Sequence, residues 1–366
     1  MQIPFFNYSA LHFQEQEKIK PVIEDVLSRG AYILQKDLED FENSLAKYCK
    51  VKHAIGVANG TDALWLSLIA AGIGQNDEVI LPSHTYVASP ASIRFVGATP
   101  ILVDCNEDHL IDPDSIKRSI NSKTKAIMPV QLNGRTCDMD SIQEIASSND
   151  LLIIEDSAQG LGSLLNGKMA GTFGLAGTYS FYPAKVLGCY GDGGAVVTND
   201  DDIASKIRLL RDHGRDDNGE FITWGVNSRL DNLQAAILNE KLKYFNNDIA
   251  KRRKIASIYC DILEGNKNIN TPPPPNNESN FDTFQNFEIR AKQRDQLKKY
   301  LYDNSIGTII QWGGKAVHQE KKLGLTNFRL PKTDALFEEC LMLPMNTSIN
   351  DSDAEYVANK VNEFYG

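Results

Sequence analysis

Four apolar runs constrain the fold of this chain more than any other feature of its sequence. The runs are 78–83 (EVILPS), 99–105 (TPILVDC), 124–130 (TKAIMPV) and 151–158 (LLIIEDSA). None shows the apolar–polar alternation of a strand with one face in water. Runs of this kind are typical of strands buried on both faces, as in a parallel sheet covered by helices. Because helical patterns lie between them, the sequence predicts an α/β fold with a mostly parallel sheet.

The character of the sequence changes near residue 245. A long, charged helical pattern covers 246–264, and 271–280 (TPPPPNNESN) is rich in residues that end helices and strands. We therefore predict a large α/β domain over 1–245 and a smaller α+β domain over 246–366, joined by the long helix. The elements expected beyond the loop are the β-rich segments FQNFEIRA and GTIIQW and helices over 292–304 and 351–364.

Charge and hydropathy exclude two classes of partner. The formal net charge is −10 and the isoelectric point is near 5.2, whereas a general nucleic-acid binder needs a basic surface. The most apolar stretch, 63–73, is far shorter than the ~20 residues of a membrane helix. The first residues lack a basic start followed by an apolar run, so we expect no signal peptide. The sequence predicts a cytoplasmic protein that binds neither nucleic acid nor membrane.

The sequence contains no pattern of metal ligands. Its six cysteines are scattered without a Cys-x-x-Cys pair, and we interpret them as ordinary reduced thiols. Isolated histidines such as His84 and His109 have no metal-binding spacing between them. We expect no metal.

Two segments place polar groups at the ends of apolar runs. In 58–62 (ANGTD) a helix begins, and its free N–H groups, its dipole and the hydroxyl of Thr61 suit a phosphate. Threonine and aspartate also cap helices routinely, which is the better interpretation of this segment by itself. Asp156, where LLIIED ends, is placed to hold a protonated ring nitrogen or, alternatively, to cap the following helix.

Lys185 follows a short aromatic strand and precedes the glycine-rich segment 188–194 (GCYGDGG). Most lysines are solvated, but a lysine in this setting is partly desolvated, which lowers its pKa and allows its amine to form a Schiff base. Ser180, five residues earlier, is placed to bind the same phosphate as Thr61. A phosphate anchor, a strand-end carboxylate and a loop lysine in one α/β domain are what pyridoxal phosphate chemistry requires.

These segments belong to longer motifs, which follow one another as ANGTDAL, PSHTYVAS, PILVDC, AIMPV, IEDSAQGLG, SFYPAK, GDGGAVVTND and GVNSRLDNLQAAIL. In this order they resemble the DegT/DnrJ/EryC1/StrS family of sugar-nucleotide aminotransferases. The resemblance covers nearly the whole chain and is densest from Ala58 to Gln234. It implies a fold type I enzyme with pyridoxal 5′-phosphate as cofactor, assembled as a homodimer with shared active sites.

The resemblance also implies roles for residues that hold the cofactor. Lys185 matches the lysine that attaches the cofactor covalently, and Asp156 matches the partner of the pyridine nitrogen. Gly60, Thr61 and Ser180 match the phosphate anchors.

Three further positions are carried over in the same way, and Arg229 is a candidate because it lies beside one of them. Gln159 matches the residue near the cofactor's O3′, and Tyr86 matches the ring that stacks on the pyridine face. Asn227 matches the asparagine that reaches the phosphate of the neighbouring subunit. Arg229 beside it binds a substrate carboxylate or phosphate, or alternatively forms a salt bridge that orders the loop.

Two segments depart from the family pattern. Residues 32–36 (YILQK) stand where many relatives have Gly-Pro, and 310–318 (IQWGGKAVH) stand where many have a His-Tyr-Pro stretch that lines the sugar pocket. This predicts a different sugar from that of the best-known members. Trp312 and His318 are candidate substrate contacts, the alternatives being a core tryptophan and a surface histidine.

The resemblance implies transfer of an amino group, with L-glutamate as the expected donor, in the biosynthesis of amino sugars for surface glycans. The expected acceptor is a 3-keto or 4-keto 6-deoxyhexose on dTDP or UDP, with a preference for the 3-position. Two alternatives stay open. One is a dehydratase of the same family, although some of these replace the lysine at Lys185 with histidine. The other is a regulator that keeps the fold and binds a ligand without turnover.

Overall fold

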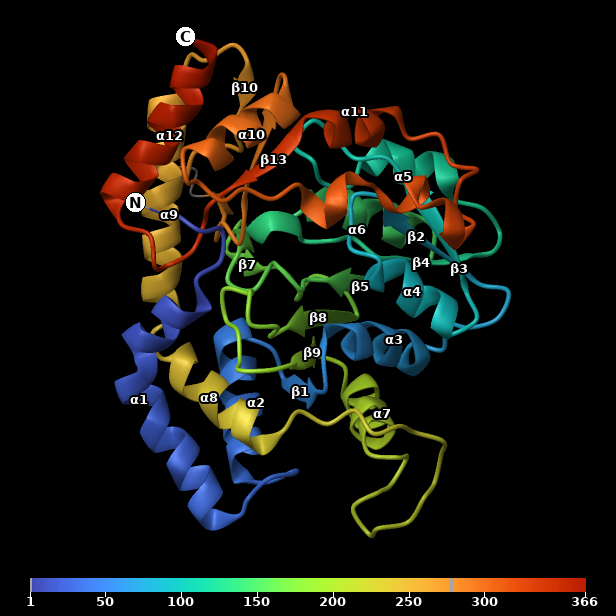
Figure 1. Ribbon diagram of the computed structural model, residues 1–366. Coiled ribbons are helices and arrows are strands. Elements are labelled where there is room, and N and C mark those ends of the chain that lie inside the picture. Colours follow the sequence, from blue (N-terminus) through green and yellow to red (C-terminus); the bar gives the residue numbers. More distant parts are fainter. Residues whose placement is uncertain (1, 277–278) are drawn as a thin grey trace.

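The computed structural model describes residues 2–276 and 279–366 (Figure 1). The predicted breaker-rich segment 271–280 includes residues 277–278, which lie outside the described part of the chain. Within the described residues, no helix is both long and apolar enough to cross a membrane.

Seven strands of the described chain form the central sheet, in the order β1-β9-β8-β5-β4-β2-β3. From β8 to β3 every neighbouring pair is parallel, whereas β9 runs antiparallel to both β8 and β1. The predicted mostly parallel sheet is therefore confirmed. The strands are β1 His53–Val57, β2 Glu78–Pro82, β3 Thr99–Val103, β4 Thr124–Ile127, β5 Leu152–Asp156, β8 Ala176–Ser180 and β9 Gly194–Thr198.

Both faces of this sheet are covered by helices. Val79 and Leu81 of β2 belong to one apolar core, which includes residues of α3, α4 and α7. Ile80, between them, belongs to another core with residues of α5 and α6. Because neither face meets water, the strands need no polar side, which accounts for their uninterrupted apolar runs. The helices are α3 Gly60–Ala70, α4 Ala88–Phe95, α5 Pro113–Ser119, α6 Met139–Ser148 and α7 Asp201–Arg211.

Three helices pack together beside β1. α1 (Tyr8–Arg29) begins after Asn7, whose side chain caps it by accepting from the N–H of Ala10 at 3.1 Å. It ends at Gly30, which has the left-handed conformation with φ 61°. α2 spans Lys36–Cys49. α8 (Asn232–Leu242) packs against both helices and buries Ala235, Ala236, Ile237 and Leu238 within the same chain.

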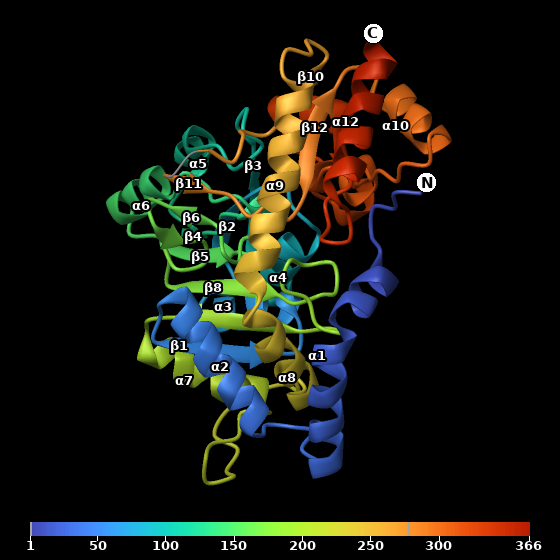
Figure 2. The same ribbon diagram turned by 90° about the vertical axis from the view of Figure 1, so that its left-hand side faces the viewer.

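The last third of the chain builds a second core around an antiparallel sheet of β10, β12 and β13. Figure 2 shows the long helix α9 (Phe245–Leu263) running from the region of α8 to this sheet. The segment 310–330 turns back, so that Val317 and Leu330 join a core of the central sheet. The elements are β10 Ile269–Asn270, β12 Phe287–Ala291, α10 Arg294–Asp303, α11 Pro331–Glu339, β13 Cys340–Leu343 and α12 Asp351–Tyr365; β6 Leu164–Leu165, β7 Lys168–Met169 and β11 Asn280–Phe281 form a small third sheet.

The predicted β-rich segment GTIIQW does not form a strand. Ile309 makes only an isolated bridge to Met342, and the chain then enters a short 3₁₀ turn over Gln311–Gly314. Trp312 and Gly313 within that turn have positive φ values of 47° and 73°, which are incompatible with an extended strand. The division into domains at residue 245 stays a prediction.

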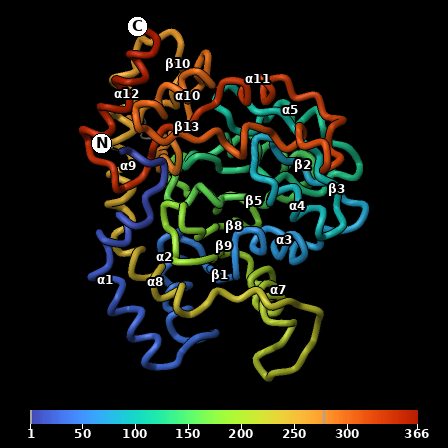
Figure 3. The backbone as a smooth tube through the Cα atoms, in the orientation of Figure 1, coloured from blue at the N-terminus to red at the C-terminus, as the bar shows by residue number. Residues whose placement is uncertain are grey.

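The N-terminal segment is tied to the second core. The N–H of Ile3 donates to the carbonyl of Ser305 at 2.9 Å, and the N–H of Gly307 donates to the carbonyl of Ile3 at 2.8 Å. The side-chain amide of Asn346 donates to the carbonyl of Phe5 at 3.0 Å. Figure 3 shows the start of the chain lying beside its last third.

Candidate active site

Asp156 lies at the carboxyl end of β5, where the sheet meets the site. Its side chain is buried, and its Oδ2 accepts from the Ser89 hydroxyl at 2.6 Å while its Oδ1 accepts from the Ala158 N–H at 3.2 Å. Burial raises the pKa of Asp156, whereas these two donors and the charge of Lys185 oppose the rise. The carboxyl group is therefore held in one orientation and faces a cation.

Lys185 lies in the loop between β8 and β9, where its N–H donates to the carbonyl of Tyr182 at 2.8 Å. Desolvation of its amine lowers the pKa to about 8, and Asp156 acts in the opposite direction. A lysine with this pKa is a nucleophile near neutral pH.

Gln285, which belongs to none of the sequence motifs, holds the backbone on both sides of Lys185. Its Nε2 donates to the carbonyl of Ala184 at 2.8 Å, and its Oε1 accepts from the N–H of Val186 at 2.8 Å. Gln285 is buried and comes from the segment just before β12. The second core therefore fixes the loop that carries the lysine.

Gly60, Thr61 and Ser180 lie at the start of α3 and the end of β8. Asn59 caps α3 by accepting from the N–H of Asp62 at 2.8 Å. A Cβ atom added to Gly60 would lie 2.8 Å from the Cβ of Ser180. A larger residue at position 60 would therefore displace Ser180, and the glycine brings the helix N-terminus next to that hydroxyl.

Gln159 lies in the segment directly after β5, and Tyr86 lies in the loop between β2 and α4. Oε1 of Gln159 accepts from the N–H of Asn133 at 2.8 Å and from Nδ2 of Asn286 at 3.3 Å. The carbonyl of Tyr86 accepts from the N–H of Ser89, the residue that also binds Asp156. The Tyr86 side chain is 57% exposed, so its ring face is open for stacking.

Asn227 and Arg229 belong to the segment before α8. Asn227 is exposed, and the neighbouring Ser228 donates to Asp62 Oδ2 at 2.6 Å, which ties the segment to the first turn of α3. Nη1 of Arg229 donates to Asp212 at 3.0 Å. The structure thus contains the loop-ordering salt bridge considered from the sequence, and a substrate contact of Arg229 stays a prediction.

Trp312 and His318 are both packed against protein groups. The Trp312 ring lies 5.3 Å from the His84 ring. His318 is buried rather than on the surface: its Nδ1 pairs with the Ser83 hydroxyl at 2.8 Å and its Nε2 with Asp334 at 2.9 Å. Neither ring nitrogen of His318 is left for a ligand, so any substrate contact there stays a prediction.

The groups assembled here fit pyridoxal phosphate. The N-terminus of α3 beside Ser180 suits the phosphate, the buried Asp156 suits a protonated pyridine nitrogen, and the amine of Lys185 suits an aldehyde. Among the described residues, no group of three or more histidine, cysteine, aspartate or glutamate side chains is arranged to hold a metal ion.

Known proteins match the chain along almost its entire length. The model of the DegT/DnrJ/EryC1/StrS aminotransferase family matches residues 14–362. The chain is 40% identical over 363 residues, 99% of both proteins, to a dTDP-3-amino-3,6-dideoxy-alpha-D-galactopyranose transaminase of Aneurinibacillus thermoaerophilus. It is 37% identical over 369 residues, 100% of this chain and 99% of the relative, to a pleiotropic regulatory protein of Geobacillus stearothermophilus. The solved structure of S. venezuelae DesV in complex with a ketimine intermediate has a TM-score of 0.95 and 36% identity, and the match covers 99% of this chain and 98% of that one.

The lowered pKa predicts how Lys185 reacts in the cofactor-free protein. Its rate of acylation should rise with pH and reach half its maximum near pH 8, because only the neutral amine reacts. Asp156→Asn should move this midpoint lower, since the lost carboxylate favours the charged amine. Peptide mapping with mass spectrometry measures both. Lys36, whose hydrogen bond to Asp40 raises its pKa, serves as the internal reference; a common midpoint for both lysines would contradict the assignment.

Proposed function

We propose that this chain transfers an amino group from L-glutamate to the 3-keto carbon of a nucleotide-linked 6-deoxyhexose. The premise is its family: the chain belongs to the DegT/DnrJ/EryC1/StrS family of pyridoxal-phosphate-dependent sugar-nucleotide aminotransferases. The observation that carries the proposal is the pairing of Lys185, with a pKa of about 8, and the buried Asp156. Asp156 pairs in the sheet with Thr178, two residues before Ser180, which adjoins the N-terminus of α3.

Each residue proposed to hold the cofactor has its own role in the reaction. Pyridoxal phosphate, when bound, supplies an electron sink for the carbon that loses or gains the amino group. Asp156 keeps the proton on the ring nitrogen, which maintains that sink. Lys185 first attaches the cofactor and, after its amine has been released, moves a proton to and from the substrate carbon. Gly60, Thr61 and Ser180 hold the phosphate.

The 3-position and dTDP are supported by the relative that is named a dTDP-3-amino-sugar transaminase and shares 40% identity with this chain. The segment 310–318, which we propose to line the sugar pocket, contains Trp312 in a left-handed conformation followed by two glycines. We place Trp312 at the sugar end of the site and Arg229 at a phosphate or carboxylate of a substrate. Both assignments remain proposals.

The two alternative functions differ in what they require of Lys185. A dehydratase in which histidine replaces this lysine is disfavoured, because Lys185 is present and the charge of Asp156 acts on its amine. A ligand-binding regulator receives support from the name of the Geobacillus relative. It does not require the lowered pKa of Lys185 or the intact set of cofactor-binding residues, so amino transfer is the better explanation.

Turnover with a panel of sugar nucleotides tests the function. The holoenzyme is incubated with L-glutamate and the 3-keto and 4-keto 6-deoxyhexoses of dTDP and UDP, and the products are identified by mass spectrometry and NMR. We expect 2-oxoglutarate and a 3-amino sugar, together with a borohydride-reduced cofactor adduct on Lys185. An adduct with no turnover on any acceptor would favour the regulator, and loss of water without amino transfer would favour the dehydratase.

Asp156→Asn should leave the protein folded and lower kcat by ~100-fold or more, the scale expected when a group that controls proton position is lost. An amide cannot keep the ring nitrogen protonated. Steady-state kinetics and circular dichroism measure the two effects. Ser89→Ala is the matched control, because it removes only one donor to Asp156 and should have a smaller effect. Near-normal turnover of Asp156→Asn would mean that Asp156 serves only to cap the turn that follows β5, where no helix forms.

We further propose a homodimer in which Asn227 of one chain completes the phosphate site of the other. The helix that follows, α8, does not by itself support this arrangement, since its buried face is already covered by α1 and α2. The loop before α8 supports the proposed homodimer. Phe221, Ile222 and Trp224 are 72%, 58% and 96% exposed, on a loop that projects from the body in Figure 1. Large apolar side chains gathered on one exposed loop favour a protein contact.

Mixing two inactive variants tests the shared site. Lys185→Ala and Asn227→Asp are each expected to lose most activity, and mixed dimers should regain part of it, because one of their two sites contains both intact residues. Subunit exchange is followed by native mass spectrometry, and Asn218→Asp on the same exposed loop is the matched control for the added charge. Exchange without recovery of activity would contradict a shared site.

A further inference from the structure

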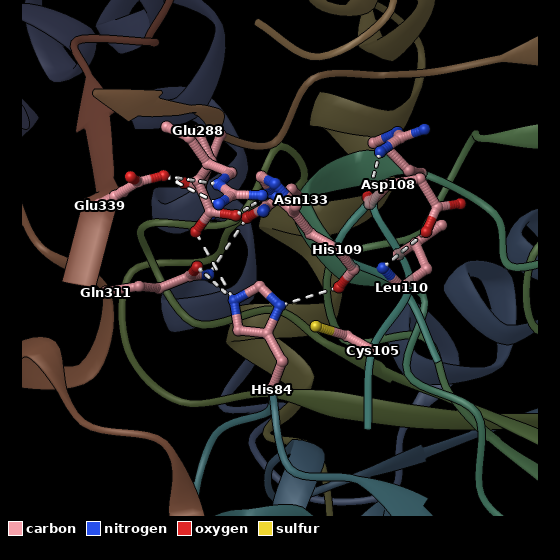
Figure 4. Close-up of polar contacts among 12 residues, drawn as sticks. His84, Cys105, Asp108, His109, Leu110, Asn133, Glu288, Gln311 and Glu339 are labelled. Carbon is pink, nitrogen blue, oxygen red and sulfur yellow. Dashed lines mark hydrogen bonds and ion pairs between the residues drawn. The ribbon is translucent and has the colours of Figure 1, made fainter. Parts of the chain in front are cut away.

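Glu288 lies in a buried cluster of polar side chains where the second core meets the central sheet (Figure 4). It comes from β12, whereas His84 and His109 come from the loops that follow β2 and β3. Nδ1 of His109 donates to Glu288 Oε1 at 2.8 Å, and His84 Nε2 lies 3.6 Å from Glu288 Oε2. The two histidines are isolated in the sequence, and the fold brings both to one carboxylate.

The acceptors around His84 require a proton on each of its ring nitrogens. Nδ1 faces the carbonyl of His109 at 2.8 Å, and a carbonyl can only accept. Nε2 faces Oε1 of Gln311 at 3.3 Å and the Glu288 carboxylate. The ring is therefore an imidazolium, buried between the rings of Trp312 and Phe337 with Glu288 as its counter-ion.

The pKa shifts of the pair agree with this geometry. Burial by itself would lower the pKa of His84, but Glu288 outweighs burial and raises it. Burial by itself would raise the pKa of Glu288, but His84 and His109 hold it well below its usual range. Breaking one partner of such a pair leaves an uncompensated buried charge.

A chain of amides continues from this ion pair to the cofactor site. Oε1 of Gln311 accepts from His84, so the Nε2 of Gln311 faces Oδ1 of Asn133 and donates to it at 3.1 Å. Nδ2 of Asn286 donates to the same oxygen at 2.9 Å and also to Oε1 of Gln159 at 3.3 Å. The N–H of Asn133 donates to that Gln159 oxygen as well, at 2.8 Å. These two hydrogen bonds hold Gln159 by its oxygen and use neither hydrogen of its NH₂ group.

We propose that Glu288 is a positioning residue: its ion pair with His84 sets the direction of an amide chain that holds the NH₂ group of Gln159 toward the cofactor's O3′. The inference rests on the proposed function, which places the cofactor beside Gln159. Without the carboxylate, His84 gives up a proton and the lone pair of its nitrogen meets Oε1 of Gln311. Gln311 then has to turn over, its oxygen meets Oδ1 of Asn133, and the hold on Gln159 loosens.

The test measures cofactor binding and the absorption spectrum of the bound cofactor at one fixed pH. Glu288→Gln should weaken cofactor retention about three- to tenfold, the effect of one lost hydrogen bond, and should shift the spectrum in the same direction as Gln159→Leu. The double variant should show no effect beyond that of Gln159→Leu, because both changes remove the same contact. Glu288→Asp, which keeps the charge, should restore part of the retention.

Two further variants make the outcome decisive. Glu339→Gln removes a neighbouring carboxylate that pairs with Arg290 outside the amide chain, and it should leave the spectrum unchanged. Gln311→Met breaks the chain while keeping both members of the ion pair, His84 and Glu288, and should reproduce Glu288→Gln, so it decides the question if that variant does not fold. Additive effects in the double variant, or a wild-type spectrum in Gln311→Met, would overturn the inference. A wild-type protein that binds no cofactor at Lys185 would instead overturn the proposed function.

Discussion

Helices cover both faces of the central sheet and exclude water from its strands. A polar side chain is therefore stable there only where it makes several hydrogen bonds or where its strand ends. Glu155 and Asp156 show the two cases. Glu155 points into the interior and accepts from Gln131 and from three backbone N–H groups, those of Gly171, Phe173 and Gly174. Asp156, one residue later, reaches the strand end and takes only two donors. Because Asp156 lies at a strand end, its carboxylate can still accept from a ligand. Ser180 lies at the end of β8 and is open to a ligand for the same reason.

The parts of this arrangement that depend on local sequence could be predicted. Uninterrupted apolar runs predicted the mostly parallel sheet, and the positions of Asp156 and Lys185 relative to those runs placed them at strand ends and in a loop. Contacts between distant segments could not be predicted. Gln285 lies about one hundred positions from the lysine loop that it holds, and nothing near Glu288 in the sequence indicates that two histidines face it. The segment GTIIQW was mistaken for a β-rich element because the left-handed Trp312 is not visible in its composition.

The two sides of the candidate site are built from different kinds of structure. The residues proposed to hold the cofactor lie at the ends of strands and at the start of α3, where the backbone is fixed by the sheet. The residues proposed to face the sugar lie in a 3₁₀ turn and in the loop before α8. A rigid cofactor side and a loop-built substrate side allow one chemistry to be combined with different sugars, since loops change without disturbing the core.

The tie between Ile3 and the second core has a consequence for how the protein is made. Ile3 pairs with the backbone at Ser305 and Gly307, and Phe5 is held by Asn346. During synthesis, Ile3 and Phe5 therefore lack these partners until residues 305–346 have been made. Translation at ~5–20 residues per second makes this interval tens of seconds long. During that time Ile3 and Phe5 lack the contacts that bury their apolar side chains in the folded protein.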